Sequence, residues 1–545
     1  MAAEPKQIDM QDETRLAELG YKQELRRDWT LMHNFGVSFS IISVITGITT
    51  LFSYGLNTGG PGSMTVGWIV VSFMTFFVGL SMAEIVSAIP TSGGPYFWAA
   101  MLAPKKHAPF LSWLTGWFNF VGQFAVTTGI SFGCAGLIAT AVTIKNSDFL
   151  ATPGKVLGIY AAILVSHGLV NTFGVQVLKH LNNTSIVLHS LGVGSLAIAV
   201  VAKAPTHLTA SEVFQHFYDV RIIELSVYVG TGDPGWSVRA SPAYVAICGI
   251  LLGQYTITET DKEKGFDASA HLSEETHRAS WNAPMGILMS VGVSAVFGFF
   301  LMLCLLFSIQ NFNDTVDPTT NYGEPVFKIL VDVFGPDGAL VLIALIIICV
   351  WHCGLFSLTS NSRMMFAFSR DGALPRFFDH VDKRFSSPVR TVWLAAFLSF
   401  CLSLPSLGSA VAFSAATSIA TIGLYISYAL PILIAVIWPK NLVKGPFDLG
   451  LFSRPVSVIA CCWVLFITVV FCLPEANPVT SQTLNYTPVA VGIVAVGTLG
   501  SWIVWAHRWF KGPTRQLEVE WGQTGIVVEE KTAAGPEAEK ESKIE

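Results

Sequence analysis

Two stretches of the sequence place groups that bind polar solutes inside otherwise apolar segments. The first is SVITGITT at residues 43–50, where one glycine stands among four hydroxyl residues. β-Branched residues and glycine are poor helix formers, and hydroxyl groups can hydrogen-bond backbone that leaves a helix. An interrupted helix here would expose amide N–H groups that can bind a carboxylate. The alternative is that these small residues only pack against a neighbouring helix.

The second stretch is GFDASAH at residues 265–271, followed by Glu274, Glu275 and Thr276. An acidic side chain at membrane depth costs about 2.5–3.5 kcal/mol on insertion scales, so its presence there suggests a function. The two stretches lie in the first and the sixth apolar segments, which open two successive blocks of five. This spacing predicts a five-plus-five inverted repeat with a solute site between the repeats.

The composition indicates the elements that must position these stretches. Of the 545 residues, 52% are hydrophobic and 13% are charged, against roughly 25% charged in an ordinary soluble domain. Segments of ~20 apolar residues are long enough to cross a bilayer as helices. We therefore predict an all-α polytopic membrane protein with twelve transmembrane helices, of which the first and sixth are broken. The predicted segments are residues 34–56, 63–88, 111–142, 154–174, 184–203, 241–258 with its continuation, 285–309, 338–361, 391–406, 410–437, 455–473 and 486–507.

The distribution of Lys and Arg predicts the orientation of these helices. With the N-terminus in the cytosol, most basic residues fall in cytosolic loops, as the positive-inside rule requires. Both termini are then cytosolic. The predicted organisation is an N-terminal tail (1–33), a membrane domain (34–510) and a C-terminal tail (511–545) that is charged, without apolar periodicity and expected to be disordered.

In many short motifs the chain resembles the amino acid–polyamine–organocation superfamily. Within it, the resemblance is to the fungal and plant amino acid/choline permeases, which include GABA permeases. It covers nearly the whole membrane region, with the motifs in the same order. They are residues 36–40, 43–52, 59–61, 83–85, 90–96, 265–276, 362–364, 367–372, 374–375 and 445–450.

The resemblance implies a secondary transporter that works by alternating access and is driven by a proton gradient. It also implies roles for residues at the two breaks. The first-helix residues that would receive the carboxylate of an amino acid are Thr46, Gly47, Ile48 and Thr49. The sixth-helix residues that would line the amine and side chain of the solute are Gly265, Phe266, Asp267, Ala268 and Ser269.

Two further residues are candidates for proton coupling. His189 lies within the fifth segment, and the unperturbed pKa of histidine, about 6.5, suits a proton carrier. Glu84 lies near the inner end of the second segment, just before the PTSGG motif at residues 90–94. For each, a structural role is the alternative: a packed histidine that is satisfied by hydrogen bonds, and a carboxylate that holds a loop backbone.

Charged residues at the inner ends of the first and eighth helices suggest a gate. Transporters of this fold often close the cytosolic side with an ion pair, and we hypothesise that Arg26 or Arg27 pairs with Asp371. The alternative is that the arginines only anchor the orientation of the first helix.

The leading function is therefore transport of an amino acid or related amine, such as GABA or choline, across a plasma or vacuolar membrane of a eukaryote. A nutrient sensor that binds solute without net transport is the alternative. An enzyme lacks support, since we find no nucleophile–base arrangement or phosphate-binding loop. A channel is a further alternative, because the sequence of one chain does not exclude a symmetric selectivity ring. All nine cysteines lie in apolar runs without metal-ligand spacing, so we expect no metal and no cofactor. The expected partners are the solute, a proton and the lipid bilayer, without nucleic acid.

One short segment conflicts with a membrane helix. Between Thr258 and Gly265 stand six residues, ETDKEK, from Glu259 to Lys264, of which five are charged. At mid-membrane these charges would cost on the order of 10 kcal/mol unless they were paired or wetted. The leading hypothesis is a gene-model or splice-boundary error. The alternatives are a real insertion in a water-filled vestibule and an insertion that abolishes transport.

Sequencing the transcript distinguishes these hypotheses. If the segment is an artefact, reads across this region join the codon of Thr258 directly to that of Gly265. Reads that contain all six codons would defeat the artefact hypothesis.

Overall fold

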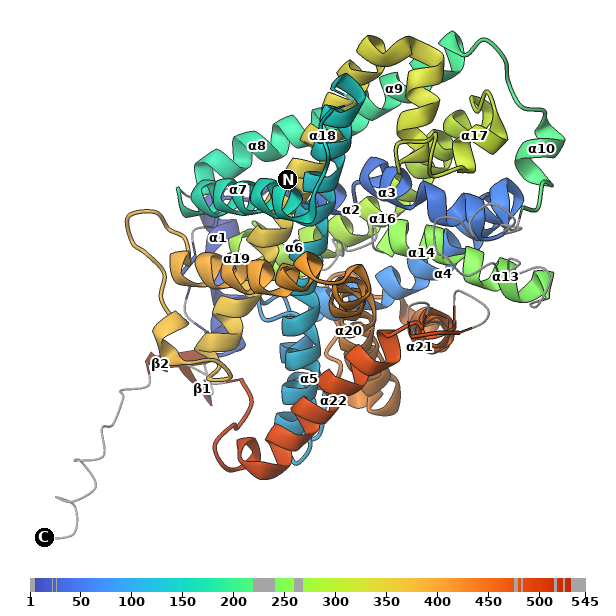
Figure 1. Cartoon of the computed structure of the whole chain (residues 1–545). Coiled ribbons are helices and arrows are strands. Elements are labelled where there is room, and N and C mark those ends of the chain that lie inside the picture. The colour runs from blue at the N-terminus through green and yellow to red at the C-terminus, as the bar shows by residue number, and fades with distance from the viewer. Residues whose placement is uncertain are drawn as a thin grey trace, which may run out of the picture.

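A bundle of long helices makes up most of the molecule, as the computed structural model shows (Figure 1). The structure describes residues 5–21, 23–25, 27–146, 148–173, 175–218, 241–258, 268–474, 479–481, 484–513, 517–522 and 525–530.

The first half of the chain forms the N-terminal segment and five helical crossings of the bundle. Its helices are α1 (Pro5–Glu18), α2 (Leu31–Ile42), α3 (Val44–Asn57), α4 (Gly60–Ala88), α5 (Pro95–Leu102), α6 (Ala108–Lys145), α7 (Pro153–Thr172), α8 (Val175–Val187), the π-helix η1 (Leu188–Gly192), α9 (Val193–Lys203) and α10 (Ala210–Phe214). The pairs α2/α3 and α8/α9 each follow one continuous path, interrupted at Ser43 and at η1.

The second half begins with the short helices of the sixth segment. Its helices are α13 (Pro242–Gly249), α14 (Leu251–Thr258), α15 (Ala268–His271), η2 (Ser273–Glu275), α16 (Ala279–Phe307), α17 (Phe312–Val316), α18 (Pro325–Arg370), η3 (Arg376–Phe378), α19 (Val389–Ser403), η4 (Leu404–Leu407), α20 (Ala410–Ile437), η5 (Pro439–Asn441), η6 (Gly450–Phe452), α21 (Ser453–Phe471), α22 (Thr487–Val504) and η7 (Ala506–Arg508). In the C-terminal tail, β1 (Leu517–Gly522) pairs antiparallel with β2 (Gly525–Glu530).

The bundle confirms the prediction of an all-α polytopic membrane protein. Eleven of the described helical runs are long and apolar enough to cross a membrane. The sixth predicted segment, 241–258, instead holds a shorter apolar run, Pro242–Gln254. Its expected continuation across residues 259–267 lies outside the described residues. The count of twelve and the inverted repeat therefore stay predictions.

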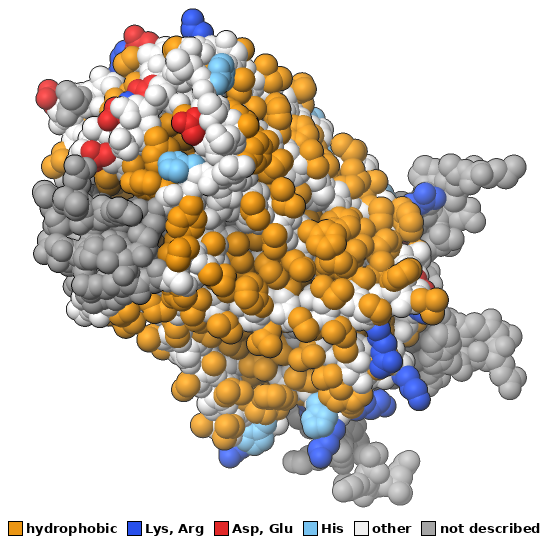
Figure 2. Space-filling view, turned by 90° about the vertical axis from the view of Figure 1, so that its right-hand side faces the viewer, with side chains coloured by type: hydrophobic (Ala, Val, Ile, Leu, Met, Phe, Trp, Pro, Cys, Tyr) orange, Lys and Arg blue, Asp and Glu red, His pale blue; other side chains and the backbone are white. Residues whose placement is uncertain are grey.

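The surface of the bundle separates charged groups from apolar ones. Figure 2 shows hydrophobic side chains over a broad band of one face, with acidic side chains gathered at the upper left and basic ones at the lower right. Such a band, bounded by polar edges, suits a bundle whose apolar side chains face lipid.

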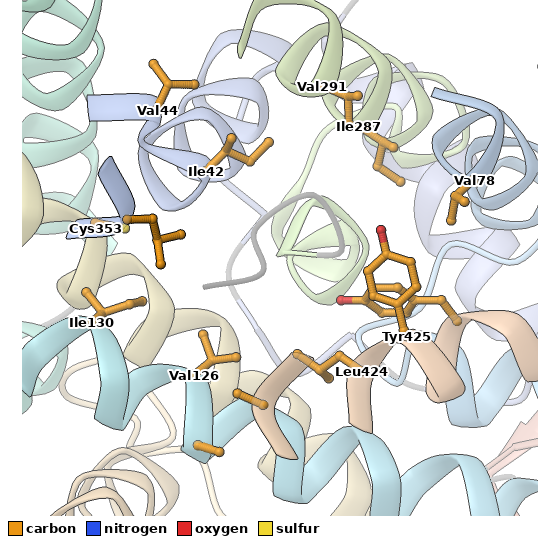
Figure 3. Packing of buried hydrophobic residues seen from close by; sticks show 14 of the residues in the cluster. Ile42, Val44, Val78, Val126, Ile130, Ile287, Val291, Cys353, Leu424 and Tyr425 are labelled. Carbon is orange, nitrogen blue, oxygen red and sulfur yellow. The ribbon is translucent and has the colours of Figure 1, made fainter. Parts of the chain in front are cut away.

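Small residues let the central helices approach one another closely. A Cβ atom added at Gly298 of α16 would lie 2.2 Å from the Trp68 ring of α4, and one at Gly116 of α6 would lie 2.4 Å from the Phe368 ring of α18. Close packing through small residues is typical of membrane helices. Figure 3 shows apolar side chains of the central helices around the middle of the bundle, among them Ile42 and Val44 on either side of the interruption in α2/α3.

The segment before α2 packs against one end of the bundle. Leu16, Tyr21 and Leu25 are buried, and the Arg15 guanidinium donates to the carbonyl of Ala88 at 2.7 Å. We call this end the N-terminal end. It comprises residues 12–21, 23–25, 27–30, 84–107, 271–280, 363–390, 438–454 and 505–513, which lie together there.

Candidate functional site

The first membrane helix is broken at Ser43. This residue has φ +29° and ψ 71°, a conformation that costs a non-glycine residue about 1–3 kcal/mol. Its carbonyl accepts from the amides of Thr46 and Gly47 at 2.8 and 3.3 Å. On the other side of the break, the carbonyl of Ile41 accepts from the Cys353 thiol at 3.0 Å. The surrounding protein therefore satisfies several of the backbone groups that the break releases.

A chain of hydrogen bonds joins this break to the fifth helix. The Ser43 hydroxyl lies 2.6 Å from that of Thr46 and 2.9 Å from Nε2 of His189. Nδ1 of His189 lies 2.9 Å from the carbonyl of Ser185. Because a carbonyl only accepts, Nδ1 carries the proton and Nε2 accepts from Ser43 when the ring is neutral. His189 belongs to the π-helix η1, a feature frequent at functional sites.

The break lies at the first residue of the 43–50 stretch, three residues before Thr46. Thr46, Gly47, Ile48 and Thr49 are buried and form the first turns of α3. Ser43 takes the left-handed conformation and leaves Gly47 helical, so the break itself is at Ser43, and the predicted role of Thr46 to Thr49 in binding the solute stays a prediction. Val44 and Ile45 are the first two residues of α3, directly after the break. The N-terminus of a helix attracts an anion, because its amides lie at the positive end of the helix dipole.

Residues of the sixth segment lie beside the first helix. The Ser269 hydroxyl of α15 is 2.7 Å from the Ser38 hydroxyl of α2, and the Asn34 amide donates to the Ser269 carbonyl at 3.1 Å. Ala268 and Ser269 are fully buried. The other residues predicted for this break, Gly265, Phe266 and Asp267, lie outside the described residues.

Further polar side chains from other helices are buried in the bundle. Gln254 of α14 donates to the Tyr425 hydroxyl of α20. The Thr127 hydroxyl of α6 lies 3.0 Å from that of Ser357 of α18 and accepts from Asn361 at 3.3 Å. Burying a polar group costs free energy unless the group is hydrogen-bonded. These side chains meet that requirement by bonding one another inside the bundle.

Two buried ion pairs lie at the N-terminal end. Arg370 binds both carboxylate oxygens of Glu274 at 3.0 Å, and Arg363 binds Glu275 at 2.8 Å. All four side chains are at most 1% exposed. Burial alone would raise the pKa of Glu274, but the Arg370 guanidinium holds that pKa below its ordinary value. The pair therefore stays charged at neutral pH.

Asp371 lies next to these pairs and binds two tyrosines. Its carboxylate accepts from the hydroxyl of Tyr21 at 2.6 Å and from that of Tyr96 at 2.9 Å. Burial and the Asp371 carboxylate raise the pKa of Tyr21 well above its ordinary value, so Tyr21 donates as a neutral phenol. The Arg370 guanidinium also lies 4.0 Å from the centre of the Tyr21 ring. The N-terminal segment is thus held to the end of α18.

Of the two arginines predicted to pair with Asp371, the structure describes Arg27. Arg26 lies outside the described residues. Arg27 donates to the carbonyl of Thr276 at 2.8 Å and lies 3.7 Å from the Asp12 carboxylate. Arg27 thereby ties the N-terminal segment to the residues after η2.

Glu84 lies at the N-terminal end, where it holds a loop. Its carboxylate accepts from the amide of Leu449 at 3.3 Å and from the hydroxyl of Ser453 at 2.7 Å. These bonds match the alternative of loop support. His189, in contrast, contacts the helix break directly.

The sequence did not reveal the partners of the two buried pairs. A usable signal was present: Arg363 and Arg370 are seven residues apart, which places them on one face of a helix. Two arginines on a buried helical face call for acidic partners, and the sixth-segment motif holds three acids, Asp267, Glu274 and Glu275. The tyrosines that bind Asp371 carried no comparable signal.

Comparison with known proteins places this architecture in a family. The model of the family described as amino acid permease matches residues 34–496, which include the break at Ser43, the sixth segment and the buried ion pairs. The chain belongs to the amino acid permease family. The permease is thus a transporter rather than an enzyme.

Relatives from plants and yeast align along almost the whole permease. It is 43% identical to the amino-acid permease BAT1 homolog of Oryza sativa subsp. japonica over 517 residues, which are 92% of this chain and 96% of the relative. It is 43% identical to the amino-acid permease BAT1 of Arabidopsis thaliana, with 93% and 96% covered. It is 30% identical to the GABA-specific permease of Saccharomyces cerevisiae, with 93% and 86% covered. The permease is therefore an integral membrane protein that transports amino acids.

The stabilising role of the buried Arg370–Glu274 pair at the N-terminal end can be tested by mutation. Glu274→Gln leaves the Arg370 charge buried without its carboxylate, and such a loss costs about 3–5 kcal/mol. We expect the melting temperature of the purified permease to fall clearly in Glu274→Gln and to recover in part when Arg370→Gln is added. The matched control is Lys444→Gln, which breaks the exposed pair with Asp448 and should leave the melting temperature unchanged. A Glu274→Gln variant that melts like the unaltered permease would contradict a buried, stabilising Arg370–Glu274 pair.

Proposed function

We propose that this permease moves an amino acid or a related amine, such as GABA or choline, by alternating access driven by a proton gradient. The observation that carries the proposal is the break at Ser43, after which Val44 and Ile45 begin α3 with their amides at its N-terminus. Those amides, at the positive end of a helix dipole, bind the carboxylate of the solute. Thr46 and Ser269 contribute hydroxyl groups from the two facing segments.

The N-terminal end of the bundle faces the cytosol in this proposal. Its loops carry many basic residues, which favours the cytosolic side. They include Lys105, Lys106, Arg376, Lys383, Arg384, Arg390, Lys440 and Lys444. Both termini are then cytosolic. The contacts of Tyr21 and Tyr96 with Asp371 close that side, and opening toward the cytosol requires them to separate. The membrane is the plasma or the vacuolar membrane.

His189 is the proposed proton carrier. In the neutral ring, Nε2 accepts from Ser43, whereas in the protonated ring Nε2 becomes a donor and the Ser43 hydroxyl must turn toward another acceptor. Protonation of His189 therefore changes the hydrogen bonds at the solute site itself. Glu84 lies at the loop from Leu449 to Ser453 and has no such connection to the break.

Uptake measurements test the proposed transport activity. In a yeast strain that lacks its own permeases, we expect expression of this chain to raise uptake of one or more radiolabelled amino acids, with faster uptake at acidic external pH. A panel of amino acids, GABA and choline as competitors then defines the substrate. Solute binding without flux in proteoliposomes would favour the alternative of a nutrient sensor and would contradict transport.

Variants of the Ser43–His189 contact test the proton coupling. His189→Gln cannot be protonated, so we expect uptake to lose its pH dependence while exchange of labelled for unlabelled solute continues. Ser43→Ala removes the hydroxyl that links the break to His189 and should lower uptake at least tenfold. The control is Ser195→Ala, which removes an exposed hydroxyl from the membrane helix that also holds His189. An unchanged pH profile in His189→Gln would assign proton coupling elsewhere.

A further inference from the structure

A cavity lies away from the break at Ser43, between α6, α22 and the loop that follows α18. Its volume is about 700 Å³, within the range of small-molecule sites. The residues that matter for its chemistry are Trp113, Trp117, Arg376, Gly497, Trp505 and Trp509. None of them takes part in the solute site described above.

Most of the cavity wall is apolar and aromatic. Trp113 is buried and donates its indole N–H to the Thr498 carbonyl at 3.2 Å. The indole N–H of Trp117 is also buried, but among the described residues it has no hydrogen-bond acceptor. A buried donor without an acceptor is costly, so the wall favours an occupant that brings an oxygen acceptor to an apolar space.

A single charged side chain stands in the described wall of the cavity. Arg376 is exposed and lies five residues after Asp371. Asp379 interacts electrostatically with Arg376, so an anionic occupant shares this guanidinium with a carboxylate. Arg508 and Lys511 flank Trp509 in the sequence and add positive charge to this part of the N-terminal end. The charge favours an anionic head group.

The cavity lies where the bundle meets lipid head groups. The α22 helix runs along the outside of the bundle (Figure 1) and, of the membrane-spanning helices, has the smallest buried share. Trp505 and Trp509 at its end are 58% and 47% exposed. Tryptophan side chains concentrate at the membrane–water interface. The cavity is therefore accessible to molecules that reside in the bilayer.

From this combination we propose that the cavity binds an anionic phospholipid from the leaflet at the N-terminal end. Its acyl chain fills the tryptophan-lined space, an ester oxygen accepts from the Trp117 indole, and the phosphate pairs with Arg376. Basic pockets between membrane helices on the cytosolic side are suited to such head groups. Binding of this lipid does not depend on the proposed substrate or proton coupling.

Photo-crosslinking in nanodiscs tests the proposal on the full-length permease. The probe is phosphatidylserine with a diazirine on its acyl chain, and the reference is phosphatidylcholine with the same chain. We expect adducts on peptides that contain Trp113–Trp117 or Val494–Trp509, with about fivefold more labelling by phosphatidylserine, the preference that one basic side chain near an anionic lipid provides. Water-soluble glycerophosphoserine should not compete, because it lacks the acyl chains.

Two variants and two controls make the result specific. A Cβ atom at Gly497 would meet no atom within 4 Å, so Gly497→Leu fills the cavity without a clash and should reduce labelling at least fivefold. Gly500 is equally open on the same helix but lies outside the cavity wall, so Gly500→Leu should label normally. Arg376→Gln should remove the preference for phosphatidylserine, whereas Arg384→Gln should keep it. Equal labelling by both lipids in the unaltered permease, or full labelling of Gly497→Leu, would overturn the proposal.

Discussion

A helix that loses its regularity inside an apolar bundle must find hydrogen-bond partners for the backbone groups it releases. In this permease the constraint acts at Ser43, whose unusual backbone conformation is held by contacts from several helices. Cys353 of α18 binds the carbonyl of Ile41, and His189 of η1 binds the Ser43 hydroxyl. These contacts explain how the break is stabilised and which helices must move together if it changes shape. The Val44 and Ile45 amides, at the N-terminus of α3 directly after the break, are the groups the proposed solute would contact.

The N-terminal end shows how the bundle encloses this region from one side. The buried pairs of Arg370 with Glu274 and of Arg363 with Glu275 connect the end of α18 to the residues after α15. Because buried ion pairs gain little net stability over apolar packing, we infer that their value lies in specifying one arrangement of the two segments. Asp371 then binds Tyr21, so that the N-terminal segment covers the same joint. In the proposed alternating-access cycle, this joint would have to open as a unit.

Sequence reasoning succeeded where a property is repeated along the chain. Hydropathy over ~20 residues predicted the membrane helices, and the family motifs identified the regions around 43–50 and 265–276. It failed where the position of a feature, such as the helix break, depends on the backbone conformation of one residue. Glycine is the expected point of interruption, yet Ser43 rather than Gly47 carries the positive φ angle, and the contact of Ser43 with His189 comes from tertiary packing. For the same reason the sequence could not show that Tyr21 and Tyr96 bind Asp371, although loop support by Glu84 was among its alternatives.

The most direct test of the account is a cryo-electron-microscopy structure of the full-length permease with a transported amino acid bound. The account predicts density for the solute carboxylate within hydrogen-bonding distance of the Val44 and Ile45 amides, with the rest of the molecule between α3 and the residues near Ser269. A first helix that runs unbroken through Ser43, or a solute bound away from it, would contradict the account.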